Sequence, residues 1–241
     1  MSTFFMEVRK EKRTGVITVL FAVGILGALY AFANFAVRGE TLFSMPLEPM
    51  DVLLTQLYGM IMVLNMFGII VAACMIYNME FCGNAIKKMY LLPVSVPKMY
   101  LCKFMILTVM LFIAVVIQNL ALALIGMREL PAGTFIPETV IKFAGYSFMT
   151  SMPVLAFMLL ISSRSSNVWV PLGIGVAGFL SGMAFATSKS SILLFSPFVV
   201  MLKPAVAMSA ATDSGVLLAA FAETLLFTGI GLGMSKFLRF E

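Results

Sequence analysis

Residues 54–77 read LTQLYGMIMVLNMFGIIVAACMIY, and this stretch contains no charged side chain. At a rise of 1.5 Å per residue, a helix of about 20 residues crosses the hydrocarbon core of a bilayer. A predominantly apolar run of this length therefore predicts a helix that spans a membrane.

Five further apolar runs of similar length lie on either side of this stretch. The six predicted helices cover residues 15–36, 54–77, 104–126, 138–161, 168–187 and 214–235. Of the 241 residues, 61% are hydrophobic and 11% are charged, whereas a soluble domain carries about 25% charged residues. We therefore expect an all-α membrane protein, with 1–241 forming a single transmembrane domain and any nucleotide-hydrolysing domain on another chain.

The basic residues predict the orientation of these helices. Eleven of the sixteen Lys and Arg residues lie on one side of the predicted membrane and five on the other. Because cytoplasmic loops are enriched in Lys and Arg, the first side is predicted to be cytoplasmic, with both termini inside. The first apolar run is longer than the core of a typical signal peptide, so we expect it to remain in the protein.

A shorter apolar stretch at 191–202 lies between the fifth and sixth predicted helices. It is too short to span a membrane, it contains Pro197, and Pro204 follows it. We predict a short re-entrant hairpin at the outer face, within residues 188–213. Irregular backbone at that depth must be shielded by protein or line a wet cavity.

The sequence offers little for catalysis or metal binding. It contains no histidine, and its three cysteines, Cys74, Cys82 and Cys102, form no CxxC pair. The phosphate-binding pattern GxxxxGK[ST] is absent. We therefore expect no catalytic residue, no metal site and no cofactor on this chain.

Glu223 is the acidic residue placed well inside a predicted span. Such a carboxyl usually faces a bundle interior or water and marks function. The alternatives are a protonated Glu223 bonded to a neighbouring helix, or a span drawn one turn too deep. Gln118, Asn119 and Asn65 are possible polar partners, so we regard Glu223, Gln118 and Asn119 as candidate translocation or gating residues.

Two pairs of glycines are spaced for close helix packing. Gly178 and Gly182 lie in the fifth predicted helix, and Gly229 and Gly233 lie in the sixth. Small residues at this spacing let two helices approach closely. We predict packing seams at these positions, within the chain or between two chains.

The predicted cytoplasmic loop 78–103 contains the stretch EFCGNAIKKMYLLPVSVPKMYLCK at 80–103. Residues 85–92 can form a short helix with Ile86, Met89 and Tyr90 on one face, and Pro93 stops it. Periodicity alone leaves two interpretations open. The segment is amphipathic and either lies on the membrane or docks in a groove of a partner protein.

This stretch resembles the ABC-2 type permeases, and most of all the lantibiotic-immunity and bacitracin-resistance permeases. The resemblance rests on a series of residue types that follow one another in a fixed order. They are the acid Glu80, Gly83 or Asn84, the paired lysines Lys87 and Lys88, Leu-Pro-x-Ser at 92–95 and Lys-x-Tyr-x-x-Lys at 98–103. The opening Glu7-x-x-Lys10-x-Lys12-Arg13-Thr14 is also similar to the start of that family. Where the family often has Trp before the first of these lysines, this chain has Ile86.

The resemblance implies a type V exporter-like transmembrane domain with an interfacial segment at 1–14. It also implies a coupling helix that sits in a cleft of a cytosolic ABC ATPase, present in two copies and binding ATP and Mg. The coupling residues would then be Glu80, Gly83, Asn84, Lys87, Lys88, Leu91, Leu92 and Pro93. The outer hairpin would help to close an outer gate.

For function, the resemblance implies an exporter subunit in the bacterial cytoplasmic membrane, paired with a second permease chain as a homo- or heterodimer. Its cargo would be an amphiphilic antimicrobial peptide removed from the membrane, which gives immunity or resistance. The alternatives are another ABC-2 cargo (a drug, a lipid-linked sugar or sodium), a proton-coupled secondary transporter that uses Glu223, or a purely structural membrane subunit.

Overall fold

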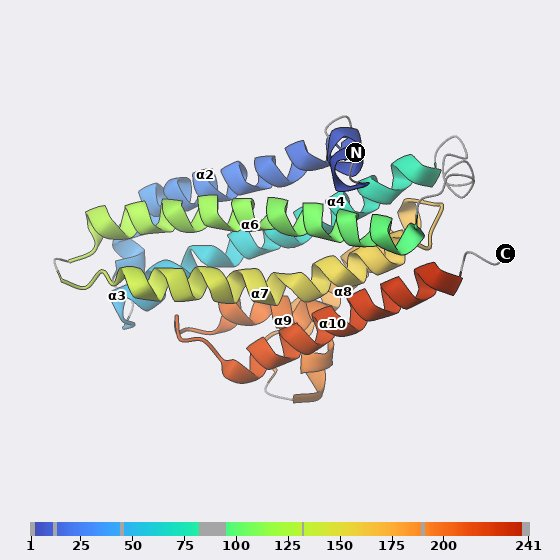
Figure 1. Ribbon diagram of the computed structural model, residues 1–241. Helices are drawn as coiled ribbons and strands as arrows, with labels where there is room; N and C mark the ends of the chain where they lie inside the picture. The colour runs from blue at the N-terminus through green and yellow to red at the C-terminus, as the bar shows by residue number, and fades with distance from the viewer. Residues whose placement is uncertain are drawn as a thin grey trace.

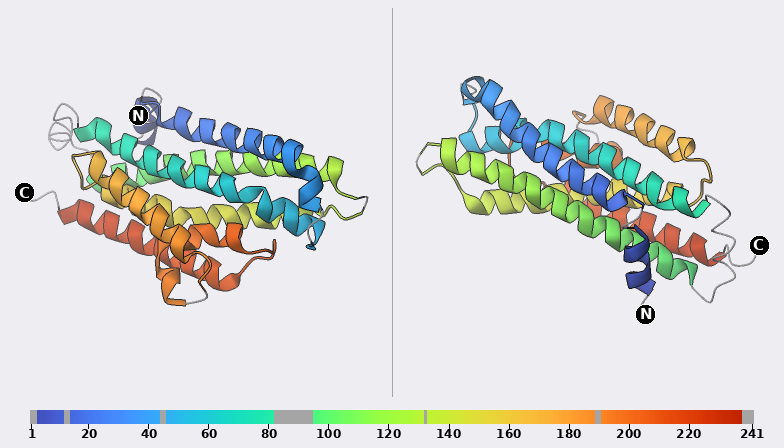
Figure 2. Two further views of the ribbon diagram at one scale, coloured as in Figure 1. Left: turned by 180° about the vertical axis from the view of Figure 1, so that it is seen from behind. Right: turned by 90° about the horizontal axis from the view of Figure 1, so that it is seen from above.

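The computed structural model describes residues 3–11, 14–43, 46–81, 95–131, 133–188 and 191–237, and regular structure within these ranges is helical. The helices run along one long axis, except for the first, which lies across it (Figures 1 and 2). The elements are α1 (Thr3–Glu11), α2 (Val16–Phe43), α3 (Pro49–Asp51), the π-helical turn η1 (Val52–Gln56), α4 (Tyr58–Phe81), α6 (Val96–Glu129), α7 (Pro137–Ser162), α8 (Trp169–Phe185), the 3-10 turn η3 (Ser191–Phe195), α9 (Pro197–Val206) and α10 (Ser214–Phe237).

Five segments are long and apolar enough to cross a membrane, and they coincide with five of the six predicted spans. They are Val16–Gly39, Pro49–Phe81, Val96–Glu129, Pro137–Ser162 and Ser214–Lys236. The sixth predicted span corresponds to α8, which has 17 residues and a length of about 25 Å. Because α7 and α10 both finish at the same end of the bundle, the chain must return between them (Figure 1). That α8 crosses the membrane stays a prediction.

Several helices extend beyond the apolar runs that predicted them. The clearest case is α6, which begins at Val96 rather than at residue 104 and has 34 residues. Pro97 lies in its first turn, where the missing N–H of proline costs no helical hydrogen bond. At about 51 Å, α6 is longer than the roughly 30 Å hydrocarbon core. The predicted loop 78–103 is therefore helical at both ends, and residues 82–94 lie outside the described ranges.

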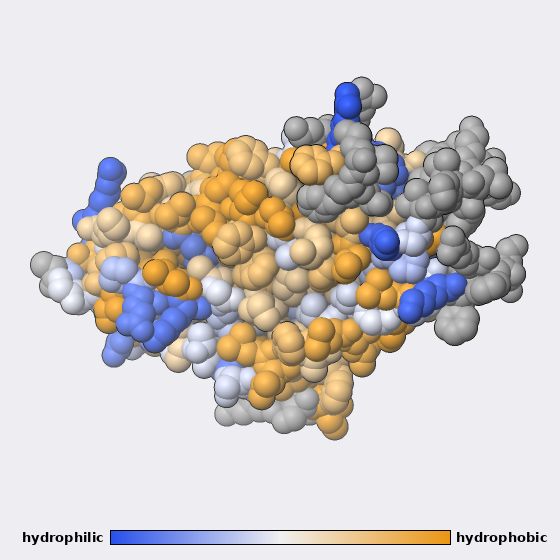
Figure 3. All heavy atoms as spheres, in the orientation of Figure 1, coloured by the Kyte–Doolittle hydropathy of each residue, from blue (hydrophilic) through white to orange (hydrophobic). Residues whose placement is uncertain are grey.

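The surface has the character of a membrane protein. Apolar spheres cover the middle of the visible face, and hydrophilic spheres gather toward the two ends of the long axis (Figure 3). The large side chains on the outer side of α10 are exposed, including Leu218, Phe221 and Leu225. Such an apolar girdle would be unstable in water and matches a bilayer.

Close packing between α2 and α6 depends on two glycines that the sequence analysis did not single out. A Cβ atom added at Gly24 would lie 2.9 Å from the Cα of Ala114, and one added at Gly27 would lie 2.6 Å from the Gln118 amide nitrogen. The two helices can approach this closely because neither glycine carries a side chain.

The predicted hairpin region contains η3 followed by α9. Pro197 lies in the first turn of α9, and the next five residues, 198–202, are buried against neighbouring helices. The Lys203 ammonium donates a hydrogen bond of 2.7 Å to the Ser188 carbonyl, which ties the end of α9 to the loop after α8. Insertion of this segment from the outer membrane face stays a prediction.

The four glycines predicted to form packing seams have different surroundings. Gly178 and Gly182 in α8 lie directly against Phe198 of α9. A Cβ atom added at Gly229 or Gly233 in α10 would meet no described residue within 4 Å. The first pair therefore faces a helix of this chain, and the second pair faces open space.

The turn between α1 and α2 requires glycine. Gly15 has φ +80, and an added Cβ would make an ordinary contact of 3.7 Å with Met75. We expect Gly15→Ala to lower the free energy of unfolding by about 1 kcal/mol, because the left-handed conformation is strained for alanine. The same change at helical Gly59, where an added Cβ would meet no described residue within 4 Å, should not destabilise the protein. Denaturant titration in detergent compares the two variants; equal stability would contradict the prediction.

Candidate functional site

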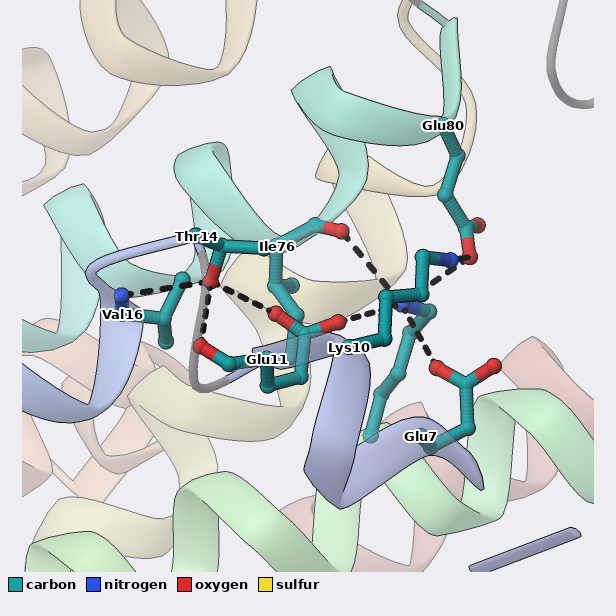
Figure 4. A network of polar contacts seen from close by, with 8 residues as sticks. Glu7, Lys10, Glu11, Thr14, Val16, Ile76 and Glu80 are labelled. Carbon is teal, nitrogen blue, oxygen red and sulfur yellow. Dashed lines mark hydrogen bonds and ion pairs between the residues drawn. The ribbon is translucent and has the colours of Figure 1, made fainter.

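A buried cluster of charges lies at the end of the bundle where α1, the end of α4 and the start of α6 meet (Figure 4). At its centre is Lys103, whose side chain is completely buried. Its Nζ lies 3.3 Å from Glu7 Oε2, 3.2 Å from Glu11 Oε1 and 3.0 Å from Glu80 Oε1. One ammonium group therefore joins carboxylates from two other helices.

The helical periodicity of α1 explains how two of the carboxylates reach Lys103. Glu7 and Glu11 are four residues apart, which places them on the same side of the helix. Both are buried, whereas Arg9 between them is exposed. The short α1 thus directs its acids toward α6 and leaves a basic residue on its outer side.

Lys103 has two further partners on α4. Its Nζ donates a hydrogen bond of 3.3 Å to the carbonyl of Ile76 and lies 5.3 Å from the centre of the Tyr77 ring. The ring face attracts a cation at this distance. The ammonium is therefore surrounded by anionic or electron-rich groups.

The cluster also contains a second lysine, on α1. Lys10 Nζ donates a hydrogen bond of 2.7 Å to Glu80 Oε1, the same oxygen that pairs with Lys103. A buried charge is tolerated only when it is paired and hydrogen-bonded, so loss of one partner leaves the others uncompensated. The end of α4 is consequently linked to both α1 and α6.

Thr14 connects this cluster to the first long helix. Its hydroxyl donates to the Glu11 side chain at 2.9 Å and accepts the Val16 N–H at 3.3 Å (Figure 4). The threonine therefore joins the end of α1 to the first turn of α2, across the Gly15 turn. Displacement of α1 would be transmitted to α2.

This arrangement brackets the predicted coupling segment. Glu80 precedes residues 82–94, and Lys103 follows them in the second turn of α6. The Glu80 carboxylate faces α1 and α6 within this chain. The other seven predicted coupling residues, Gly83, Asn84, Lys87, Lys88, Leu91, Leu92 and Pro93, lie outside the described residues.

The predicted gating residues do not form one site. Asn65 and Gln118 exchange two hydrogen bonds of 2.9 and 2.7 Å, and the Gln118 amide also donates to the Val23 carbonyl at 3.2 Å. This amide pair joins α2, α4 and α6. Among the described residues, neither carboxyl oxygen of Glu223 has a hydrogen-bond partner, although its side chain is buried.

The opposite end of the bundle has a cavity of about 780 Å³. Its lining includes the charged residues Glu48, Asp51 and Lys142. Asp51 Oδ1 accepts a hydrogen bond of 2.8 Å from the Ala210 N–H, which ties the segment after α9 to the start of the second span. The cavity and the charge cluster therefore lie at opposite ends of the bundle.

Sequence reasoning missed the charge cluster as a unit. Lys103 forms its ion pair with Glu11 across 92 positions, and Lys10 reaches Glu80 across 70. A local signal existed in the i, i+4 spacing of Glu7 and Glu11 in a basic segment. A second signal was a lysine in the opening turns of an otherwise apolar helix.

The helices, their apolar girdle and the internal polar pairs define a multi-pass membrane protein. The sequence model of the ABC-2 family transporter proteins matches residues 3–183. This is more than half of the chain and includes α1, the charge cluster and most of α8. The chain therefore belongs to the ABC-2 transporter family and is a transmembrane subunit of an ABC transporter, a transport component rather than a catalytic one.

No curated protein and no solved structure matches the chain. Members of the ABC-2 family generally work with a cytosolic ATPase. Family membership therefore favours the ATP-driven hypothesis over the proton-coupled carrier. The matched region ends before η3, so α9 and α10, with Glu223, lie beyond it.

Proposed function

We propose that this chain is the permease subunit of an exporter that removes an amphiphilic antimicrobial peptide from the bacterial cytoplasmic membrane. Membership of the ABC-2 family supports the transporter class. The resemblance of residues 80–103 to the lantibiotic-immunity and bacitracin-resistance permeases supports the cargo. The complex would contain two copies of an ATPase that binds ATP and Mg, and a second permease chain.

The observation that carries this proposal is the ionic connection between the two ends of the coupling segment. Residues 82–94 would dock on the ATPase, and closure of the ATPase pair would move them. Because Glu80 and Lys103 are ion-paired to each other at 3.0 Å, the ends of α4 and α6 would move together. Glu7 and Glu11 would transfer this motion to α1, and Thr14 would transfer it to α2.

In this mechanism, Glu80 acts inside the permease rather than on the ATPase. We assign docking on the ATPase to residues within 82–94, with Lys87, Lys88, Leu91 and Leu92 as the candidates. The bundle would then switch between two packings, as packed helices do when their ends are displaced. Gly229 and Gly233 are candidates for packing against the second permease chain, because neither meets a neighbour in the described part of this chain.

A four-residue variant tests the docking role without disturbing the cluster. We expect replacement of Lys87, Lys88, Leu91 and Leu92 by alanine to reduce co-purification of the ATPase at least tenfold, because a basic and apolar docking face is removed. Protection of cells against a panel of lantibiotics and bacitracin should be lost as well. The ATPases to co-express are those encoded nearest to this gene.

The matched control is Lys142→Ala, which removes a lysine at the opposite end of the bundle. Its Nζ lies 2.7 Å from Glu138, and both side chains are exposed. This variant should co-purify the ATPase normally and keep its protection. Undiminished ATPase binding by the four-residue variant would refute the docking role. Normal ATPase binding without any protection by the unmodified chain would refute the peptide cargo.

A further inference from the structure

A groove between α6 and α7 lies in the half of the bundle away from the charge cluster. It has a volume of about 470 Å³, within the usual range for sites that hold small ligands. Its wall is apolar except for Asn119, and Phe112, Met127, Ile141 and Gly145 contribute to it. The two helices lie side by side on the face seen in Figure 1, and this face is largely apolar in Figure 3.

The groove opens on the outer side of the bundle. Phe112, Met127 and Ile141 are 52%, 61% and 72% exposed, so their side chains are uncovered by the described part of the chain. Asn119 lies ten residues before Glu129, the last residue of α6. This separation corresponds to about 15 Å along the helix, or half of the hydrocarbon core. A molecule in the adjacent leaflet that enters the groove therefore meets the wall to which Asn119 belongs.

Asn119 provides an acceptor that the protein leaves unused. The side chain is 4% exposed, and its Nδ2 donates to the Val115 carbonyl at 2.9 Å. Its Oδ1 is buried and has no hydrogen-bond partner among the described residues. A buried carbonyl oxygen in an apolar wall is unfavourable unless a donor reaches it.

An occupant of the groove has to supply a hydrogen-bond donor to Asn119 Oδ1, and this requirement excludes several candidate molecules. Water needs two to four polar partners, and the groove offers one. A phospholipid acyl chain has no N–H or O–H group to donate. The backbone N–H groups inside a helix of a second copy are already bonded within that helix. An amphiphilic peptide brings apolar side chains together with N–H and O–H donors.

We propose that the α6–α7 groove binds an apolar side chain of the peptide cargo, which enters from the outer leaflet, while Asn119 Oδ1 accepts a hydrogen bond from the peptide. This inference rests on the proposed function for its cargo class and its orientation. It adds a lateral binding site that lies apart from the charge cluster. The groove selects cargo by two features, an apolar group that fills it and a donor at the depth of Asn119.

Two variants alter the groove in different ways. Asn119→Leu removes the acceptor at nearly constant side-chain size and leaves the helix intact. Gly145→Leu adds a side chain to the groove lining, at a position where a Cβ atom meets no described residue within 4 Å. The matched control is Gly173→Leu in α8, which adds the same side chain at another open glycine.

The experiment measures the Kd of fluorescently labelled bacitracin and of a labelled lantibiotic for the full chain, with its ATPase, in phospholipid nanodiscs. We expect Asn119→Leu to raise the Kd about tenfold, the effect of losing one buried hydrogen bond. Gly145→Leu should abolish binding of the same peptide, and Gly173→Leu should bind it as the unmodified chain does. All three variants should keep the unmodified melting temperature and should co-purify the ATPase.

Other outcomes would overturn the proposal. If the unmodified chain binds the peptide and both groove variants bind it equally well, the groove is not the cargo site and the proposed function survives. If Gly145→Leu instead removes a co-purifying lipid or the second permease chain at unchanged Kd, that molecule occupies the groove. If the unmodified chain binds neither peptide, both the groove proposal and the peptide cargo fail.

Discussion

Replacing Lys103 by methionine should lower the free energy of unfolding by about 3–5 kcal/mol, the usual cost of removing one partner from a buried ion pair. Methionine keeps most of the side-chain volume, so the effect reports the lost charge. Glu7, Glu11 and Glu80 would then lie close together, with Lys10 as the remaining cation paired with them among the described residues. Denaturant titration in detergent measures the change.

A surface ion pair gives the matched control for this prediction. Lys142→Met removes a lysine that pairs with Glu138 one helical turn away, where both side chains are mostly exposed. Exposed pairs of this kind contribute little to stability, so this variant should unfold like the unmodified chain. Adding Glu7→Gln and Glu11→Gln to Lys103→Met should recover part of the loss. Unchanged stability in Lys103→Met would mean that the cluster does not hold α1 in place.

The second large effect is expected at the contact between α8 and α9. Gly178→Leu should destabilise the protein by about 3 kcal/mol, the upper end of the usual cost of overpacking. A Cβ atom at this position overlaps the ring of Phe198. That ring is 4% exposed and packs edge-on against Phe157 at 5.8 Å between centroids, so it has little room to move.

The same substitution five residues earlier should be tolerated. Gly173 lies in the same helix, and a Cβ atom there meets nothing within 4 Å. Comparing thermal unfolding of Gly178→Leu and Gly173→Leu isolates the packing contact from the helix propensity of leucine, which is the same in both. Equal melting temperatures for the two variants would contradict this prediction. They would mean that the Phe198 ring can move aside to make room for the leucine.

The spans were the most predictable part of the fold, because each consists of a long apolar run that has few alternatives in a bilayer. Their ends were less predictable. Residues 96–103 include lysines and a proline, so hydropathy excludes them from the span, yet they form the first two turns of α6. A helix that leaves the membrane continues for as long as its backbone hydrogen bonds are made, whatever the hydropathy of its side chains.

The polar sites were harder to predict, because their partners lie far apart in the sequence. Asn65 and Gln118 were expected as possible partners of Glu223, and instead they bond to each other across 53 positions. Lys103 and Glu7 were each recognised as part of a motif, but the pairing of Lys103 with Glu7 and Glu11 was not predicted. Side-chain pairing of this kind depends on how each helix is rotated about its axis. A helix that is apolar on nearly all sides has no distinct polar face, so its sequence does not predict that rotation.

The pairing of Glu11 with Lys103 also constrains how the protein is made. The two residues are 92 positions apart, so the acids of α1 leave the ribosome long before their cation exists. The first two long helices therefore enter the bilayer before Glu7 and Glu11 can pair with Lys103, whereas Glu80 can already pair with Lys10. Helix α1 therefore takes its final place only after the opening turns of α6 have been synthesised.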